Sequence, residues 1–140
     1  MIGEEIVEFI KKSLVIARDN QHKFVTVEHM LLVLLDDVNI SQALNYCGAD
    51  IAQLRSELAT YLATKIPMVE ITKKLTPQTI TLFDLVLLDA VMHSVRAKRE
   101  VTGLDLLRSI FVARNSHAVF CLEQHRVSQE YVLSCIARVH

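Results

Sequence analysis

The chain has 140 residues, of which 51% are apolar and 22% charged, and 15 basic against 16 acidic residues give a formal net charge of −1. This composition excludes a disordered chain, and the near-neutral charge argues against a general nucleic-acid binder. Only three glycines and two prolines are present, which favours helices joined by short loops over a β-sandwich or β-barrel.

Four helices are predicted before residue 66 from the spacing of apolar residues. The first has its apolar residues three or four positions apart, at Ile6, Ile10, Leu14 and Ala17. The second follows Thr26, a good N-cap residue, and extends to about Asp36. Its run from Met30 to Leu35 is apolar on nearly every face, so this helix should lie at the centre of the core.

The third predicted helix runs from about Ile40 to Cys47 and ends at Gly48, a common left-handed C-terminal stop. Asp50 then caps a fourth helix, whose apolar stripe consists of Ile51, Leu54, Leu58 and Leu62.

Residues 66–78 break the helical pattern and contain both prolines, so they are predicted to form the one long connector. Helical spacing resumes from about Thr79 to Lys98. A capping box from Thr102 to Asp105 opens a sixth helix, assigned to about 106–114. A seventh helix is predicted over about 116–124, and Ser128 caps an eighth.

The two halves of the chain repeat one another. Val25-Thr26 matches Val101-Thr102 at a separation of 76 residues, and Ala49-Asp50 matches Val127-Ser128 at 78. The predicted fold is therefore all-α, a pseudo-two-fold tandem repeat of two four-helix units within a single domain, residues 1–140. Repeat one is placed at about 1–65, the connector at about 66–78 and repeat two at about 79–140.

Several kinds of chemistry and location are excluded or disfavoured by simple patterns. Glycines only at positions 3, 48 and 103 cannot build a phosphate-binding loop, so no nucleotide cofactor is expected on this chain. The longest wholly apolar run, Met30 to Leu35, is too short to span a membrane. An acidic start without a basic n-region argues against a secretory signal, and three cysteines that cannot all pair favour the cytosol.

Two arrangements leave a catalytic or metal-binding alternative open. Cys121 and His125 are four residues apart on one helix and can in principle meet as thiol and base; the interpretation adopted is a core cysteine beside a helix-end histidine. His22 and His29 flank the entry to the second helix, and two imidazoles at one corner leave a metal site as the alternative. We instead expect His29 to lie buried with a hydrogen-bond partner and His22 to be solvated, with no metal ligand and no catalytic residue.

The block from His22 to Leu32 resembles the first-repeat signature of the Clp N-terminal domain, the double four-helix module of Clp-type AAA+ unfoldases. Its Val25-Thr26-Val27-Glu28-His29 stretch is closer to the ClpA branch. Three further blocks are also similar to ClpA-like sequences, namely Cys47 to Asp50, Glu100 to Gly103 and His125 to Ser128.

This resemblance implies a non-catalytic domain that docks an adaptor of the ClpS type and contacts substrates directly. The parent protein would be a cytoplasmic hexameric ATPase that binds ATP on separate AAA+ modules and delivers substrates to a ClpP-type peptidase. We expect an isolated domain of this kind to present grooves between its halves, in which apolar anchors bind within a polar rim.

Adaptor contacts in the family map to His22, Lys23, Glu28, Thr81 and Asp84. Lys23 stands where the ClpA-like pattern carries an acid, which changes the charge offered to a ClpS-type adaptor. A related branch binds phosphorylated arginine through a Glu in each repeat, but the second-repeat position that matches Glu28 is Leu104. The resemblance therefore argues against arginine-phosphate recognition here.

The alternative function is a regulatory module that uses the same fold to bind a different protein. Lys23 favours it, and so does the apolar and basic connector, with Met68, Val69, Ile71, Lys73, Lys74 and Leu75. The cluster of Arg96, Lys98 and Arg99 is interpreted as an ordinary cationic helix end, with a rim for an acidic partner as the open alternative.

Overall fold

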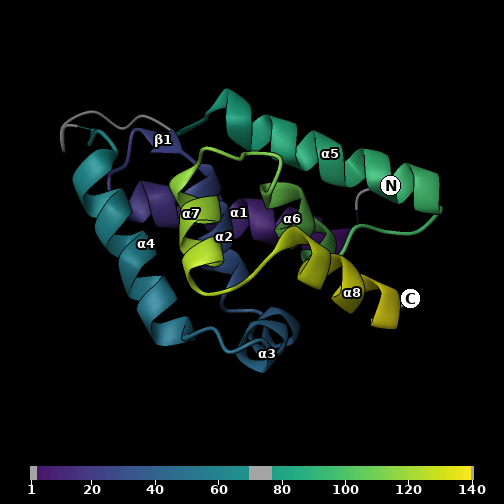
Figure 1. Ribbon diagram of the computed structural model, residues 1–140. Coiled ribbons are helices and arrows are strands. Elements are labelled where there is room, and N and C mark those ends of the chain that lie inside the picture. The colour runs from purple at the N-terminus through teal and green to yellow at the C-terminus, as the bar shows by residue number, and fades with distance from the viewer. Residues whose placement is uncertain (1–2, 70–76, 140) are drawn as a thin grey trace.

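The computed structural model describes residues 3–69 and 77–139, and within these ranges the chain forms eight helices and two very short strands (Figure 1). The first four helices are α1 (Glu4–Asp19), α2 (Val27–Leu34), α3 (Val38–Tyr46) and α4 (Ile51–Lys65). The second four are α5 (Thr81–Ala97), α6 (Gly103–Ile110), α7 (His117–Gln124) and α8 (Gln129–Val139). The predicted all-α class is confirmed.

The strands β1 (Phe24–Val25) and β2 (Gln78–Thr79) pair in parallel, with Phe24 opposite Gln78. They were not predicted, because two residues carry no periodicity that distinguishes a strand from a loop. Their pairing joins the loop before α2 to the residues just before α5 and so ties the two repeats together.

The sixth helix begins and ends earlier than the predicted 106–114. Thr102 is its N-cap and shares a capping box with Asp105, so the first helical residue is Gly103. After Ile110 the bonds change from four to three residues apart, with Val112 N–H donating to the Ser109 carbonyl at 2.9 Å. This tighter turn ends the α-helix before 114. A similar turn ends α2 at Leu34 instead of the predicted Asp36, whose N–H donates to the Val33 carbonyl at 3.1 Å.

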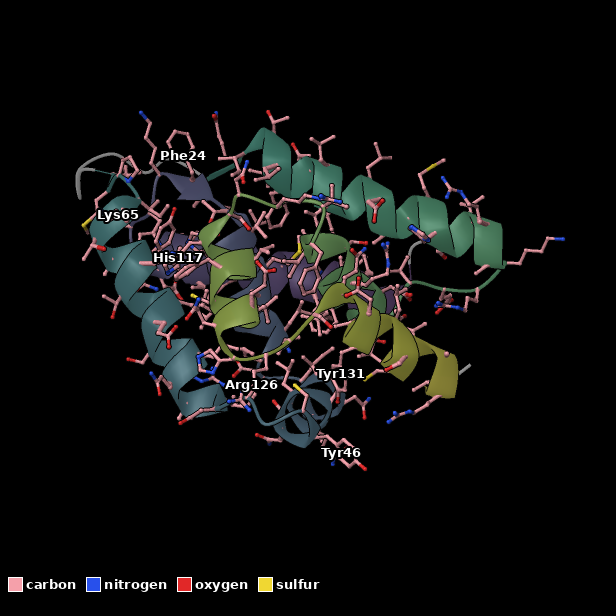
Figure 2. All side chains as sticks on the ribbon, in the orientation of Figure 1. Phe24, Tyr46, Lys65, His117, Arg126 and Tyr131 are labelled. Carbon is pink, nitrogen blue, oxygen red and sulfur yellow. The ribbon has the colours of Figure 1, made fainter. Side chains whose placement is uncertain are left out.

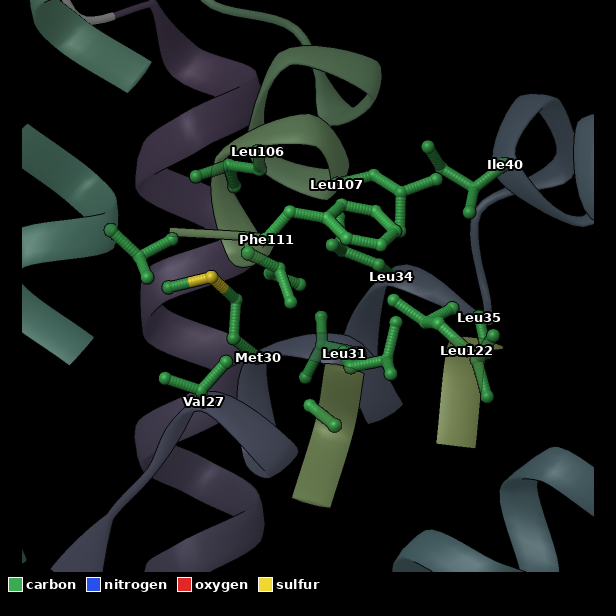
Figure 3. Close-up of a cluster of buried hydrophobic side chains, with 14 of the residues drawn as sticks. Val27, Met30, Leu31, Leu34, Leu35, Ile40, Leu106, Leu107, Phe111 and Leu122 are labelled. Carbon is green, nitrogen blue, oxygen red and sulfur yellow. The ribbon is translucent and has the colours of Figure 1, made fainter. Parts of the chain in front are cut away.

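The core is built around α2 and α6, which contact each other at the centre of the molecule. Every residue of α6 is buried, and Leu32 is the only residue of α2 that is not. Figure 3 shows the apolar side chains at this junction, among them Met30, Leu31, Leu34, Leu106, Leu107 and Phe111. The predicted central position of the second helix is confirmed.

The tandem repeat is visible in which residues each repeat buries. The first helix of repeat one, α1, buries Ile6, Phe9, Ser13 and Ala17, and α5 buries the residues 77 positions later, Phe83, Val86, Ala90 and Ser94. Equivalent helices thus present the same face to the core, which confirms the predicted pseudo-two-fold architecture.

Equivalent helices also end in the same way. Four residues just beyond helix ends have positive φ and form two pairs related by the repeat, Gln21 with Lys98 and Gly48 with Arg126. At each of them the backbone closes a Schellman motif, as where Val127 N–H donates to the Leu122 carbonyl at 2.9 Å.

Candidate docking surfaces

The loop before α2 is held between the two ends of the connector. On one side, Lys23 N–H donates to the Pro67 carbonyl at 2.8 Å, and Val69 N–H donates to the Gln21 carbonyl at 2.7 Å. On the other side, Gln78 N–H donates to the Lys23 carbonyl at 3.3 Å. These bonds, together with the β1–β2 pairing, bring this loop beside the start of α5.

The five residues predicted to contact an adaptor divide into two groups by burial. Lys23, Thr81 and Asp84 are exposed, the last two in the first turn of α5, which directly follows β2. His22 and Glu28 are only 6% and 4% exposed. The fold therefore brings the three exposed residues to one region of the surface, and we call them the adaptor patch. The contacts themselves stay a prediction.

His22 and His29 meet, and His22 is buried, so the expectation of a solvated His22 was wrong. His29 Nδ1 lies 2.9 Å from the Thr26 backbone nitrogen, and its Nε2 lies 2.9 Å from His22 Nδ1. Because a backbone N–H only donates, His29 Nδ1 must be the acceptor and its ring proton must lie on Nε2. His29 thereby completes the capping box of α2, and the expectation that it lies buried with a partner is confirmed.

Burial lowers the pKa of both imidazoles, and for His29 the pKa falls from 6.5 to about 4, with the nearby His22 adding to the effect of burial. At neutral pH both rings are therefore uncharged. Within residues 3–69 and 77–139 no group of three or more His, Cys, Asp or Glu side chains is arranged to hold a metal ion.

Repeat two closes the equivalent turn with an ion pair. Asp105 accepts from the Thr102 backbone N–H at 2.8 Å and receives both terminal nitrogens of Arg99, at 2.7 and 2.8 Å. Bonds from Arg99 and Thr102 lower the pKa of the Asp105 carboxyl in spite of burial. Arg99, predicted to be part of a helix-end cationic cluster, thus has a specific structural partner.

Glu28 joins the two repeats. Its Oε2 accepts from the Ala118 backbone N–H at 2.8 Å, and Ala118 lies in the first turn of α7. A carboxylate is well placed at this helix end, where backbone N–H groups lack partners within the helix. The side chain is thus engaged inside the molecule, where it contacts the start of α7.

A groove of about 420 Å³ lies between α3 and α8, with the start of α6 and Glu5 of α1 completing its wall. Figure 2 places Tyr46 and Tyr131 on this side of the molecule, on α3 and α8. Leu104 and Cys135 are nearly buried within it, while Tyr46 and Val139 are 81% and 64% exposed. The hydroxyl of Tyr131 donates to the Ala43 carbonyl at 2.5 Å and ties the two walls together. The groove combines apolar side chains from both repeats.

We call this groove the α3–α8 groove. Charged groups lie along its edges. Glu5 and Asp37 contribute carboxylates and Arg138 a guanidinium. Each carboxylate also serves the fold, since Glu5 accepts from the Gly103 N–H at 3.1 Å and Asp37 from the Ile40 N–H at 3.1 Å. An apolar floor within a charged rim is the pattern of surfaces that bind peptides.

The repeat-related junction, between α4 and α7, is different in character. Tyr61 and His117 stack there with ring centroids 4.3 Å apart, and His125 Nε2 lies 3.0 Å from Glu57 Oε1. The hollow beside it is lined by residues of polar type, Gln53, Ser56, Glu57, Thr60, Thr64 and Lys65, although its exposed lining is largely apolar, as in the α3–α8 groove. Sequence reasoning did not locate the α3–α8 groove, because Leu104, Tyr131 and Val139 look like ordinary core residues of their helices.

The paired arrangement of Cys121 and His125 does not suit nucleophilic catalysis. Cys121 is fully buried, and burial with the neighbouring Glu57 carboxylate raises its pKa to about 12. A reactive thiol requires the opposite shift. His125 is bonded instead to Glu57. The interpretation of Cys121 as a core residue is confirmed.

In the ranges that the structure describes, no helix combines the length and apolar character needed to cross a membrane.

The sequence matches a known family and a curated relative. Residues 1–125 match the family model described as Clp repeat (R) N-terminal domain. A ClpA homolog protein from Fuscovulum blasticum is 28% identical over 133 residues, which cover 91% of this chain. The chain spans only 16% of the length of that relative.

Solved structures share the fold at low sequence identity. The N-terminal domain of Hsp104 from Candida albicans superposes with a TM-score of 0.79 at 11% identity, covering 96% of this chain and 87% of that one. The N-domain of ClpV from Vibrio cholerae superposes with a TM-score of 0.75 at 18% identity, covering 99% of this chain and 84% of that one. The N-terminal domain of ClpD from Arabidopsis thaliana superposes with a TM-score of 0.68 at 15% identity, covering 99% of this chain and 94% of that one.

Proposed function

The chain belongs to the Clp N-terminal domain family, and on that premise we propose that it docks adaptor and substrate proteins for a ClpA-like ATP-dependent unfoldase. The rest of that protein would supply the AAA+ modules that bind ATP, the hexameric ring and the contact with a ClpP-type peptidase in the cytoplasm. On this chain the function reduces to protein binding without chemistry.

The α3–α8 groove is the observation that best supports this role. Its volume of about 420 Å³ is in the range of sites that enclose a few side chains. Apolar surface from Leu104 and Val139 offers anchors, and Glu5, Asp37 and Arg138 offer rim contacts. A short apolar segment of an unfolded substrate with a basic residue near the Glu5–Asp37 edge would match both features.

Fluorescence anisotropy with a labelled apolar peptide that carries one lysine tests this proposal. We expect the variant Val139→Lys to weaken binding about tenfold, since it places a charge at an apolar anchor. Val112→Lys is the matched control, because Val112 is 44% exposed and does not line the groove. Equal affinity of the wild type and Val139→Lys would contradict the groove as the peptide site.

The adaptor patch is proposed as a separate contact for a ClpS-type adaptor. Lys23, Thr81 and Asp84 are exposed together, whereas the buried His22 and Glu28 would act by holding the loop and α7 in place. Because Lys23 replaces an acid of the ClpA-like pattern, we expect Lys23→Glu to strengthen adaptor binding. Isothermal titration of both forms with a ClpS-type adaptor measures this, and no binding by either at tens of micromolar would overturn the adaptor role.

The alternative role, a regulatory module for a different protein, is favoured by the exposed Lys23 and the exposed Met68 beside it on the paired connector end. The other connector residues that suggested it, Ile71, Lys73, Lys74 and Leu75, lie outside the described residues. A Lys23→Glu variant that loses its partner, where the ClpA-like model expects a gain, would favour this alternative.

A further inference from the structure

Helix α5 carries an apolar stripe on its solvent side. Leu85, Leu88, Met92 and Val95 are between 44% and 56% exposed, although the opposite face of α5 is buried against the core. Their spacing of three, four and three residues is the a/d spacing of a coiled coil. Figure 1 shows α5 along one edge of the molecule. A row of large apolar side chains of this regularity marks an interaction surface.

The equivalent helix of repeat one shows that the fold does not require this stripe. Positions 77 residues earlier on α1 are Glu8, Lys11, Val15 and Arg18, and the side chains of Glu8 and Lys11 lie 4.0 Å apart as an exposed ion pair. Both helices bury the same four positions against the core. Three of the four outward positions are therefore charged in one repeat and apolar in the other, so the apolar choice on α5 serves something outside the monomer.

We propose that this stripe binds the same stripe of a second copy of the chain, with the two α5 helices antiparallel. An antiparallel pair centred on Ala90 places Leu85 of one copy beside Val95 of the other, and Leu88 beside Met92. The four apolar residues then form two kinds of layer, each repeated by the two-fold axis. Because α5 has 17 residues, or about 25 Å of helix, the stripe runs over most of its length.

The charges of α5 select this orientation. Asp84 lies in its first turn, Arg96 in its last turn and Lys98 directly beyond it, all three exposed. In the antiparallel pair Asp84 of one copy faces Arg96 of the other at both ends, whereas a parallel pair sets like charges together. Asp89, the remaining carboxylate of α5, is engaged inside the monomer, since its Oδ2 accepts from Arg108 at 2.6 Å and from Ser109 at 2.8 Å.

Sedimentation equilibrium over a dilution series of the chain tests the proposal. A two-helix contact is small, so we expect a monomer–dimer equilibrium with a dissociation constant of about 10–100 μM. The triple variant Leu85→Glu, Leu88→Lys, Val95→Arg copies the outward residues of α1 and should fold normally, because α1 carries them. It should weaken dimerisation more than tenfold. The matched control is Val15→Glu, which changes the α1 counterpart of Met92 and should leave the dimer intact.

A charge exchange tests the orientation. Asp84→Lys alone should weaken the dimer, and the double variant Asp84→Lys, Arg96→Glu should restore it, since each new lysine then faces a new glutamate. A chain that stays monomeric at the highest concentration reached would overturn the proposal. So would a dimer that the triple variant does not weaken, or a double variant that is no stronger as a dimer than Asp84→Lys.

Discussion

A neutral imidazole closes the first turn of α2, whereas an ion pair closes the equivalent turn of α6. His29 and Asp105 both accept the backbone N–H of a threonine N-cap, at 2.9 and 2.8 Å. One position thus performs the same structural task with two side chains that lose the acceptor at different pH. Asp105 keeps its function until its carboxyl is protonated, while His29 loses its acceptor as soon as Nδ1 takes up a proton.

Acidification should therefore destabilise the chain through His29 before it affects the carboxylates. Burial lowers the pKa of His29 from 6.5 to about 4, so as the pH falls the unfolded chain takes up this proton first. Stability from this group is complete above pH 6.5 and is lost between 6.5 and about 4, by about 3 kcal/mol. The lowered pKa of His22 acts in the same direction. Urea unfolding at pH 7.0 and pH 4.5 measures the loss.

His29→Gln is the control for this prediction, since glutamine at this position of a capping box accepts the same N–H and does not titrate. We expect it to cost about 1 kcal/mol at neutral pH and to lose much less stability on acidification than the wild type. Equal losses in the two proteins would show that another group controls the acid response. Asp89 and Asp105, whose pKa values are lowered below 3.8, lose their contribution only at lower pH.

Arg126 has φ 65°, where its repeat counterpart Gly48 has φ 94°. Left-handed backbone costs a side chain with a Cβ about 1 kcal/mol, which glycine avoids. Because Arg126 is exposed, Arg126→Gly should raise the free energy of unfolding by about 0.5–1 kcal/mol. Thermal and urea denaturation measure this, and Arg126→Ala, which keeps the Cβ, should give no such gain.

At the scale of elements, the attachment of α7 depends on one buried carboxylate. Glu28→Ala removes the acceptor of the Ala118 N–H and leaves that donor without a partner inside the protein, which should cost about 1–3 kcal/mol. Glu28→Gln keeps an acceptor and should cost less. Hydrogen exchange of the Ala118 amide provides the local measurement: we expect faster exchange in Glu28→Ala, and unchanged protection would show that water or another group replaces the carboxylate.

The elements that sequence reasoning predicted well are those with periodicity or a cap. Residue patterns of α1, α4 and α5 extend over four or five turns, and Thr26, Asp50 and Thr102 act as the predicted N-caps. The sequence-based predictions were wrong or incomplete where contacts between distant residues determine the local structure. The β1–β2 pairing involves residues 54 positions apart, and the backbone at the buried His22 pairs with the connector end at Met68. Neither contact leaves a local trace in the sequence.

At the scale of the whole molecule, the candidate binding surfaces depend on how the two repeats are joined. Repeat matching predicted that grooves would lie between the halves, but not that one would lie between α3 and α8. The two repeat-related junctions differ through single residues: Leu104 lines the α3–α8 groove where repeat one has Glu28, and Glu28 instead binds the start of α7. The adaptor patch also requires the β1–β2 pairing, since Lys23 and Thr81 are far apart in the chain.

Because the two repeats share one core, we expect the chain to unfold as a single unit. Leu31 of α2 and Leu107 of α6 are both fully buried, in helices that contact each other. We therefore expect Leu31→Ala and Leu107→Ala each to lower the free energy of unfolding of the whole chain by about 2–5 kcal/mol. Native-state hydrogen exchange checks this. In either variant, the protection free energy of the slowest-exchanging amides should fall by the same amount in α2 and in α6. A fall confined to the mutated repeat would mean that each half unfolds on its own, and that a groove built from both halves opens whenever one of them does.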